Sequence, residues 1–105
     1  IMRYGRGWNQ IVNDLKDDLK RMAPGIDITR VEESRFGDLS FYYDINSVDD
    51  QHAEIVARRV KRAVDVALET CTDCGEYGRI RYTSEPAIEA HVLCEKHTPK
   101  NWKTL

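Results

Sequence analysis

The 105-residue sequence predicts an α+β fold in which a helix, two strands and a second helix precede a β-hairpin bounded by cysteines. Three observations predict this order. Two stretches have the apolar periodicity of amphipathic helices, the stretch between them alternates apolar and polar residues, and the last third carries every cysteine at paired spacing. We expect residues 1–69 to form the α–β–β–α core and residues 70–105 to form the hairpin segment, both packed as one compact domain.

The first helix is predicted over residues 8–22. Apolar residues recur there at helical spacing, and mostly charged residues fill the other positions, as in a helix with one buried face. Pro24 and Gly25 follow directly and predict its end, because neither residue continues a helix well. The apolar face consists of Trp8, Ile11, Val12, Leu15, Leu19 and Met22.

Two strands are predicted next, because the apolar period changes from helical spacing to alternation. Ile26 and Ile28 begin a short strand that extends toward Val31. Residues 39–45 then alternate as a half-buried strand does, with aromatic and branched side chains on one face. The polar residues 33–38 between them favour an antiparallel hairpin. The expected buried face of the second strand is Leu39, Phe41, Tyr43 and Ile45.

The second helix is predicted to begin near Ser47, whose hydroxyl can cap it, and to run almost directly into Cys71. An amphipathic helix and a half-buried strand each need a partner for the apolar side, so we expect both helices to pack on the strands. The expected contacts join Leu15, Leu19, Val60 and Val64 to Leu39, Phe41, Tyr43 and Ile45. Two short strands are predicted in the last segment, over residues 79–83 and 90–93.

The composition excludes some classes of protein. Apolar residues make up 41% of the chain and charged residues 32%, which is typical of a folded domain. The net charge of −2 gives no field that draws the whole molecule to nucleic acid or to an anionic membrane. No stretch is apolar enough to span a bilayer, and the first residues lack the apolar core of a secretory signal. With an odd number of cysteines, these features favour a reducing compartment and a cytoplasmic location.

The cysteine segment reads C-x2-C, then 19 residues, then C-x2-H. Thiolates and a neutral imidazole are the donors that tetrahedral zinc takes in structural sites. Two ligands separated by two residues can share one tight turn, and Gly75 lets the chain turn sharply after the second cysteine. We therefore expect one structural zinc ion per chain, bound by Cys71, Cys74, Cys94 and His97. A treble clef or a zinc ribbon is the expected arrangement, with residues 98–102 available for a final helical turn.

Other interpretations of the cysteines are open. They can be unrelated buried residues, since free cysteine packs as a small hydrophobe. A redox-active C-x-x-C pair starts a helix after a strand, whereas Cys71 follows a predicted helix. Three cysteines and one histidine are an uncommon ligand set for an iron–sulfur cluster. A catalytic zinc ion keeps one position open for water, and two complete ligand pairs leave none.

Two further histidines lie outside the paired motif. His91 is an alternative fourth ligand because it precedes Cys94 by only three residues, but the C-x2-H pair with His97 matches the first pair better. His52 falls in the first turn of the second helix and is expected to be a surface or cap residue. The sequence contains no Gly-rich phosphate loop, nucleophile elbow or recognisable catalytic carboxylate pair.

These motifs together resemble a group of small proteins of unknown function encoded by bacteriophages and prophages. Members of that group have Gly-Trp before a first helix, a Lys-Phe-Gly-x-Leu-Arg-Phe-Tyr strand, and Cys-x-x-Cys-Gly-x-x-Gly before Leu-Cys-x-x-His or Leu-Cys-x-x-Cys. The resemblance covers nearly the whole chain, although Arg35 and Ser40 replace the Lys and Arg of the strand motif. It implies a phage or mobile-element origin, a bacterial host cell and a zinc site, but no activity. The matching residues are Gly7-Trp8, Phe36-Gly37-Asp38-Leu39-Ser40-Phe41-Tyr42, residues 71–79 and Leu93-Cys94-Glu95-Lys96-His97.

The sequence specifies no reaction. The lack of a catalytic motif and the complete ligand set favour a small zinc-stabilised module that binds a protein partner, for which a host protein is one candidate. The second hypothesis is nucleic-acid binding, because aromatic side chains near the cysteines can stack on bases. Residues 70–105 hold five basic and five acidic residues, which keeps that hypothesis second. A third is an enzyme whose site forms only in an oligomer. The residues considered for nucleic-acid contact are Arg79, Arg81, Lys96, Lys100, Lys103, Tyr77, Tyr82 and Trp102.

Overall fold

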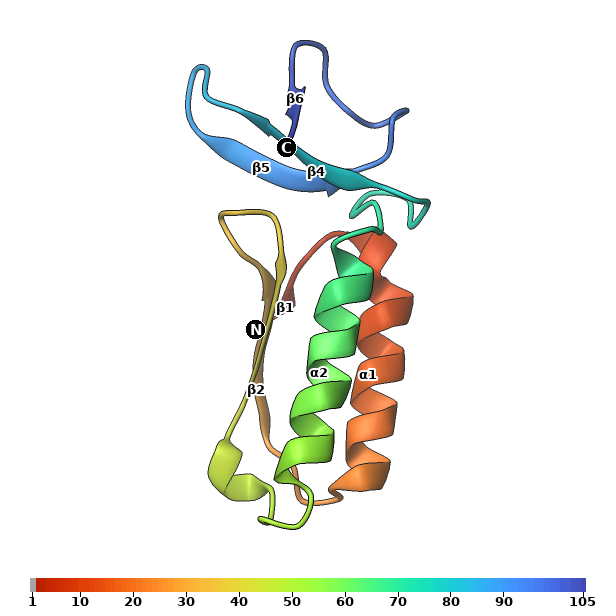
Figure 1. Ribbon diagram of the computed structural model, residues 1–105, viewed down its shortest axis with the longest axis vertical. Helices are drawn as coiled ribbons and strands as arrows, with labels where there is room; N and C mark the ends of the chain where they lie inside the picture. Colours follow the sequence, from red (N-terminus) through yellow and green to blue (C-terminus); the bar gives the residue numbers. More distant parts are fainter. Residues whose placement is uncertain (1) are drawn as a thin grey trace.

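The computed structural model describes residues 2–105 as an elongated molecule of 47 × 24 × 21 Å. Two layers lie along its long axis (Figure 1). The lower layer contains both α-helices and a three-stranded sheet, and the upper layer is a second three-stranded sheet, so the α+β class is confirmed. The helices are η1 (Arg6–Trp8), α1 (Asn9–Met22), η2 (Ile45–Ser47) and α2 (Ala53–Ala67), where η marks a 3-10 helix. The strands are β1 (Met2–Arg3), β2 (Ile28–Glu33), β3 (Leu39–Tyr43), β4 (Arg79–Thr83), β5 (Glu89–Leu93) and β6 (Lys103–Thr104).

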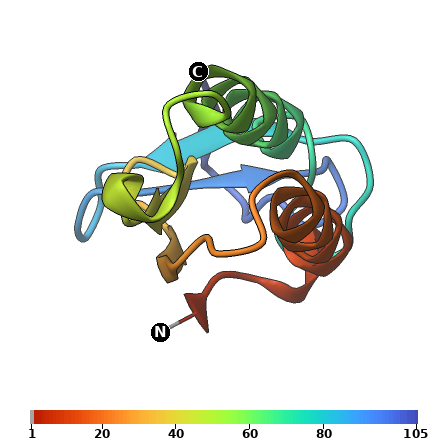
Figure 2. The same ribbon diagram turned by 90° about the horizontal axis from the view of Figure 1, so that it is seen from below.

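The lower sheet has the order β1-β2-β3. The predicted antiparallel hairpin of β2 and β3 is confirmed, and β1, which was not predicted, pairs with β2 in parallel. The two helices pack side by side on one face of this sheet (Figures 1 and 2). This arrangement gives each amphipathic helix and the half-buried strand β3 a partner for its apolar side.

The expected packing of the lower layer is largely confirmed. Leu15 and Leu19 of α1 have no exposed surface, and they cluster with buried side chains of α2 and with half-buried residues that include Val60, Phe41 and Tyr43. Val64 packs in a second cluster, with Trp8 and Leu39. Ile45 contradicts the prediction, because β3 ends at Tyr43 and the chain turns into η2, which leaves Ile45 73% exposed.

The start of the second helix was also predicted wrongly. α2 begins at Ala53, with His52 rather than Ser47 at its N-cap position. The hydroxyl of Ser47 accepts a hydrogen bond from the backbone N–H of Asp27 (2.9 Å) and donates one to the carbonyl of Asp44 (2.5 Å). Ser47 therefore closes the loop after β3 onto the residue before β2, and it is no longer available as a cap.

The upper sheet has the order β5-β4-β6, in which β4 pairs antiparallel with both neighbours. The predicted β4–β5 hairpin is confirmed, with β5 beginning one residue earlier than expected. Residues 98–102 form turns rather than a final helical turn, and β6 follows them. The predicted helical turn is therefore absent from residues 98–102, and the third strand of this sheet follows directly after them.

The two layers share one apolar cluster. Val92 of β5 is completely buried, and it clusters with buried residues of the lower layer that include Trp8, Val31 and Leu39. The tip of the β2–β3 hairpin also touches the upper sheet at Gly37, whose φ is +93°. A Cβ atom at Gly37 would lie 3.1 Å from the carbonyl oxygen of Ala90, so only glycine suits both this backbone conformation and this close approach.

Candidate metal centre

Two turns bring the predicted ligands together. Cys71 and Cys74 lie on the turn that follows α2, and Cys94 and His97 lie on the turn that follows β5. The three sulfur atoms and the ring nitrogen of His97 all lie within 4.8 Å of one another. The Sγ atoms of Cys74 and Cys94 are 3.7 Å apart, and Nδ1 of His97 lies 3.1 Å from the Sγ of Cys94 and 3.9 Å from that of Cys71.

These spacings fit a tetrahedral metal ion. Bonds of about 2.3 Å to sulfur and about 2.0–2.1 Å to nitrogen place two sulfurs about 3.8 Å apart, and a sulfur and a nitrogen about 3.5 Å apart. The observed sulfur–sulfur distance of 3.7 Å matches the first value, and the two sulfur–nitrogen distances lie on either side of the second. The four residues are therefore close enough together to hold one ion.

The first ligand turn, residues 71–75, is closed by its own backbone. We call it the knuckle. The N–H of Gly75 donates to the carbonyl of Cys71 (2.9 Å), and the N–H of Cys71 donates to the carbonyl of Glu76 (2.8 Å). Gly75 has a φ of +84°, which explains why glycine follows the second cysteine. The N–H of Thr72 donates to the carbonyl of Val92 (2.9 Å) and so fixes the knuckle to β5.

Asp73 orients the histidine ligand. Its Oδ2 lies 3.1 Å from Nε2 of His97, on the side of the ring that faces away from the thiols. A carboxylate in this position holds the proton on Nε2 and leaves the lone pair of Nδ1 for a metal ion. This role of Asp73 was not predicted, although Asp73 lies between the first two ligands, because the spacing of a motif does not show which nitrogen of a histidine faces the metal.

The backbone also favours the thiolate form of Cys71. Burial opposes ionisation of this thiol, but hydrogen bonds from the backbone of Cys94, Cys74 and Asp73 outweigh burial and lower its pKa to about 7. At Cys74, the backbone of Glu76 favours the thiolate, whereas burial and the neighbouring sulfurs of Cys94 and Cys71 raise its pKa. Three thiols this close cannot all ionise without a cation, since each thiolate disfavours the next. A bound metal ion supplies that charge.

The N-terminus packs directly against the knuckle. We call residues 4–8 the N-terminal clamp. The N–H of Gly7 donates to the carbonyl of Thr72 (2.8 Å), and the indole Nε1 of Trp8 donates to the carbonyl of Thr70 (2.8 Å). A Cβ atom at Gly7 would lie 2.1 Å from the carbonyl oxygen of Cys71, and one at Gly5 would lie 2.2 Å from that of Thr72. Both glycines are therefore required for this contact.

A charged pair adds to the clamp. Arg6 donates from Nε to the backbone carbonyl of Asp73 (3.0 Å) and lies 3.7 Å from its carboxylate. The clamp thus reaches the residue that orients His97. The sequence predicts Trp8 on the apolar face of the first helix but not its contact with Thr70, because a contact across 62 residues leaves no local periodicity.

The other two histidines lie away from the cluster. His91 pairs with Glu33 and Glu89 and stacks on Trp102, with 5.8 Å between the ring centroids. His52 pairs with Asp49 before α2, and its backbone N–H also donates to that carboxylate. Among the described residues, the group that can hold a metal ion contains His97 and not His91.

The residues considered for nucleic-acid contact are only partly gathered. Tyr82, Lys100, Trp102 and Lys103 line one groove of about 580 Å³, together with residues that include Glu85. Tyr77 and Arg79 line a different groove of about 420 Å³. Arg81 is engaged within the sheet, where it donates to the hydroxyl of Thr104 (2.8 Å) and to the carbonyl of Leu93 (3.4 Å). Neither groove is lined by Lys96.

The site is therefore a closed cluster of three cysteines and one histidine that can hold one metal ion. No protein-family model, curated protein or solved structure matches this chain, so the assignment depends on the geometry of the chain itself. Within residues 2–105, no helix has both the length and the apolar character needed to cross a membrane.

Proposed function

We propose that the cluster binds one zinc ion and that this ion has a structural role. The single observation that supports a structural role is the closed donor set: four donors converge on one point, and none of the four positions is left for water or substrate. Asp73 completes the site by holding the ring of His97, as an outer-shell carboxylate does in zinc proteins. Bound zinc would supply charge neutralisation and a crosslink between the two ligand turns.

The fold around this ion is closer to a zinc ribbon than to a treble clef. A treble clef places its second ligand pair at the start of a helix, whereas the chain after His97 continues in turns to strand β6. A ribbon instead joins two ligand turns through a small antiparallel sheet. The upper sheet supports the second description, because the knuckle before β4 and the ligand turn after β5 lie at the same end of its antiparallel hairpin.

The protein as a whole is, on this proposal, a small zinc-stabilised module that acts by binding a protein partner. A closed metal site contributes rigidity rather than chemistry, and rigid modules with exposed loops commonly serve recognition. The resemblance to phage and prophage proteins makes a protein of the bacterial host cytoplasm the first partner to test.

Two measurements test this proposal. Elemental analysis of protein purified without chelator should give one zinc per chain, and stoichiometric iron or the absence of metal would contradict it. Capture from host lysate should then be performed with and without nuclease. A captured protein that survives nuclease and binds again as a purified component supports the proposal, whereas capture that nuclease abolishes contradicts it.

The groove that contains Lys100 and Lys103 favours a second candidate function, nucleic-acid binding. Two exposed ammonium groups beside Trp102 and Tyr82 can contact phosphates and bases. The neutrality of residues 70–105 opposes it, and we expect little binding to a single-stranded oligonucleotide at physiological salt. Binding tighter than about 1 μM would favour the second candidate if Lys100→Glu with Lys103→Glu weakened it and the control Lys20→Glu, on α1, did not.

A further inference from the structure

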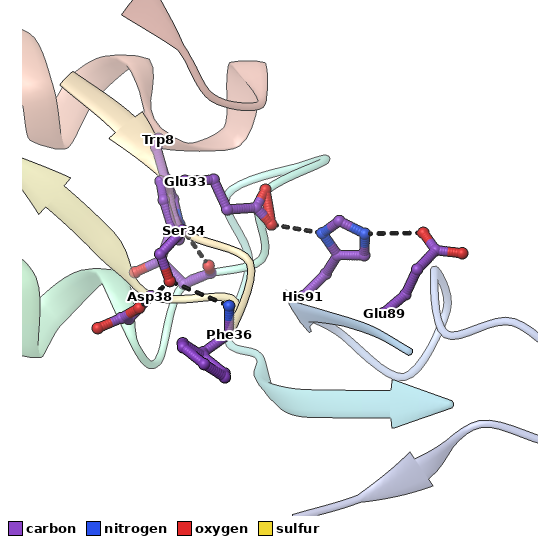
Figure 3. A network of polar contacts seen from close by, with 8 residues as sticks. Trp8, Glu33, Ser34, Phe36, Asp38, Glu89 and His91 are labelled. Atoms are coloured by element: carbon purple, nitrogen blue, oxygen red, sulfur yellow. Dashed lines mark hydrogen bonds and ion pairs between the residues drawn. The ribbon is translucent and has the colours of Figure 1, made fainter. Parts of the chain in front are cut away.

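A single histidine connects the two layers on the side of the molecule where β2 meets β5. Nδ1 of His91, on β5, binds the carboxylate of Glu33 at the end of β2 (Figure 3). The opposite nitrogen, Nε2, lies 3.4 Å from the carboxylate of Glu89, also on β5. Trp102 stacks on the ring with an interplanar angle of 15°, so the imidazole is held in one orientation. His91 therefore bridges two carboxylates that belong to different layers.

The hairpin tip beside this bridge is held by separate contacts. The hydroxyl of Ser34 binds the carboxylate of Asp38 and accepts from the N–H of Phe36 (Figure 3). Gly37 at the tip lies against the backbone of Ala90, the neighbour of His91 on β5. A change in the bond between His91 and Glu33 is therefore expected to alter the backbone environment of Gly37 and Ala90 without unfolding the hairpin tip.

The charged groups around the ring favour its protonated form. Burial opposes the charge on His91, but the hydrogen bond and negative charge of Glu33, followed by those of Glu89, outweigh burial and raise the pKa of the imidazole. Arg81 of β4 is the cross-strand partner of His91, and its guanidinium donates to the hydroxyl of Thr104 and to the carbonyl of Leu93. Glu33 is mostly buried, with 15% of its side chain exposed, so solvent screens its charge only partly.

We propose that His91 is a pH-sensitive latch between the upper sheet and the β2–β3 hairpin. In its protonated form, the imidazolium donates to both Glu33 and Glu89 and holds the layers together at this edge. Loss of the proton leaves a neutral ring that can donate from only one nitrogen, so one of the two carboxylate contacts is lost. The N-terminal clamp holds the layers on the side of the knuckle, and the latch then governs the seating of the hairpin tip on β5.

The direction of the pH dependence follows from linkage. Because the pKa of His91 is higher in the folded than in the unfolded chain, the latch contributes its full stabilisation below the ordinary histidine pKa. That contribution is lost as the pH rises through the raised pKa of the folded protein. The latch is therefore closed in mildly acidic solution and open in mildly alkaline solution.

The test is an NMR titration of the metal-loaded protein from about pH 6 to about pH 9, with metal content measured at each pH. We expect the ring of His91 to titrate above about pH 6.5, the ordinary value for histidine. The amide resonances of Gly37 and Ala90 should shift with the same midpoint. Glu33→Gln keeps the ring and removes the charge, so it should lower the midpoint of His91.

Matched histidine variants separate the latch from a general pH effect. His91→Gln should abolish the shift at Gly37 and Ala90, whereas His52→Gln should leave it unchanged, because the contact of His52 with Asp49 is confined to one loop. A His91 midpoint at or below about 6.5, or one that Glu33→Gln does not lower, would overturn the proposal. So would a shift at Gly37 that persists in His91→Gln. If that variant does not fold, the Glu33→Gln comparison still decides the question.

Discussion

The two layers of the molecule are stabilised by different means. In the lower layer, Leu15, Leu19 and Val56 have no exposed surface and pack together between the helices and the sheet. In the upper layer, between the first and last ligands, the buried apolar side chains apart from the cysteines are Val92 and Leu93. One layer thus has an apolar core, whereas the other has a small sheet that is hydrogen-bonded to the knuckle, which is in turn hydrogen-bonded to the N-terminal clamp.

This difference shows how a short chain can order a segment that lacks a core. Ordering about 30 residues costs far more than two buried apolar side chains return. If the proposed zinc ion is bound, it would contribute roughly 10–16 kcal/mol of apparent binding free energy, which is enough to offset such a deficit. A bound metal ion is expected to order the N-terminal clamp as well, because residues 4–8 pack on the knuckle and not only on the lower sheet.

The largest expected effect is loss of the metal when the proposed histidine ligand is replaced. His97→Ala should remove a donor from the cluster and release most of the metal, while His91→Ala should retain one ion per chain. Metal content of the two variants after dialysis measures this directly. Equal retention by both, or loss only in His91→Ala, would show that the ligand set is wrong.

A core truncation should destabilise the lower layer and leave the metal in place. Leu15→Ala is expected to cost about 2–5 kcal/mol, since its side chain is completely buried. Phe41 is only half-buried, so Phe41→Ala should cost less than the roughly 3–5 kcal/mol of a fully buried phenylalanine. Thermal unfolding with metal analysis checks both, and metal loss in Leu15→Ala would show that the two layers are not separable.

The third prediction concerns the clamp. Gly7→Ala places a methyl group 2.1 Å from the carbonyl oxygen of Cys71, so the clamp must move away from the knuckle, at a cost of about 1–3 kcal/mol. Trp8 should then become more exposed to solvent, and tryptophan fluorescence measures this change. Gly25→Ala is the matched control, because its new methyl would meet no atom closer than 3.9 Å. Similar spectra for the two variants would contradict the clamp.

The smallest expected effect is a change in metal affinity when Asp73, whose carboxylate contacts His97, is replaced. Asp73→Asn keeps the size of the side chain but removes the charge that holds Nε2 of His97. Metal affinity should fall about 10–100-fold while the metal-saturated variant keeps its fold. Competition with a chelator of known affinity measures this change. An unchanged affinity would mean that Asp73 contributes only through its contact with Arg6.

The elements that the sequence predicts correctly are those with a local signal. The periodicity of residues 8–22 gives α1, the alternation of residues 39–43 gives β3, and the spacing of the cysteines identifies the cluster. Each of these patterns lies within one stretch of chain, where side-chain spacing and backbone geometry are directly related. The turn at Gly75 belongs to the same group.

The features that the sequence does not reveal are contacts between distant segments. Trp8 meets Thr70, and Glu33 meets His91, across 62 and 58 residues respectively. Ser47 has the local pattern of a cap, yet its hydroxyl is used by Asp27, 20 residues earlier. In each case a tertiary contact overrides or adds to the local preference. Such a contact leaves no periodic pattern in the sequence.

The most direct test of the difference between the layers is amide hydrogen exchange before and after complete removal of the metal. We predict that amides after Thr70 lose protection, and that Gly7 and Trp8 lose it with them, because the clamp is bonded to the knuckle. Amides around Leu15 and Val56 should stay protected by the apolar core of the lower layer. Full protection after Thr70 in metal-free protein, or equal loss in both layers, would contradict the account.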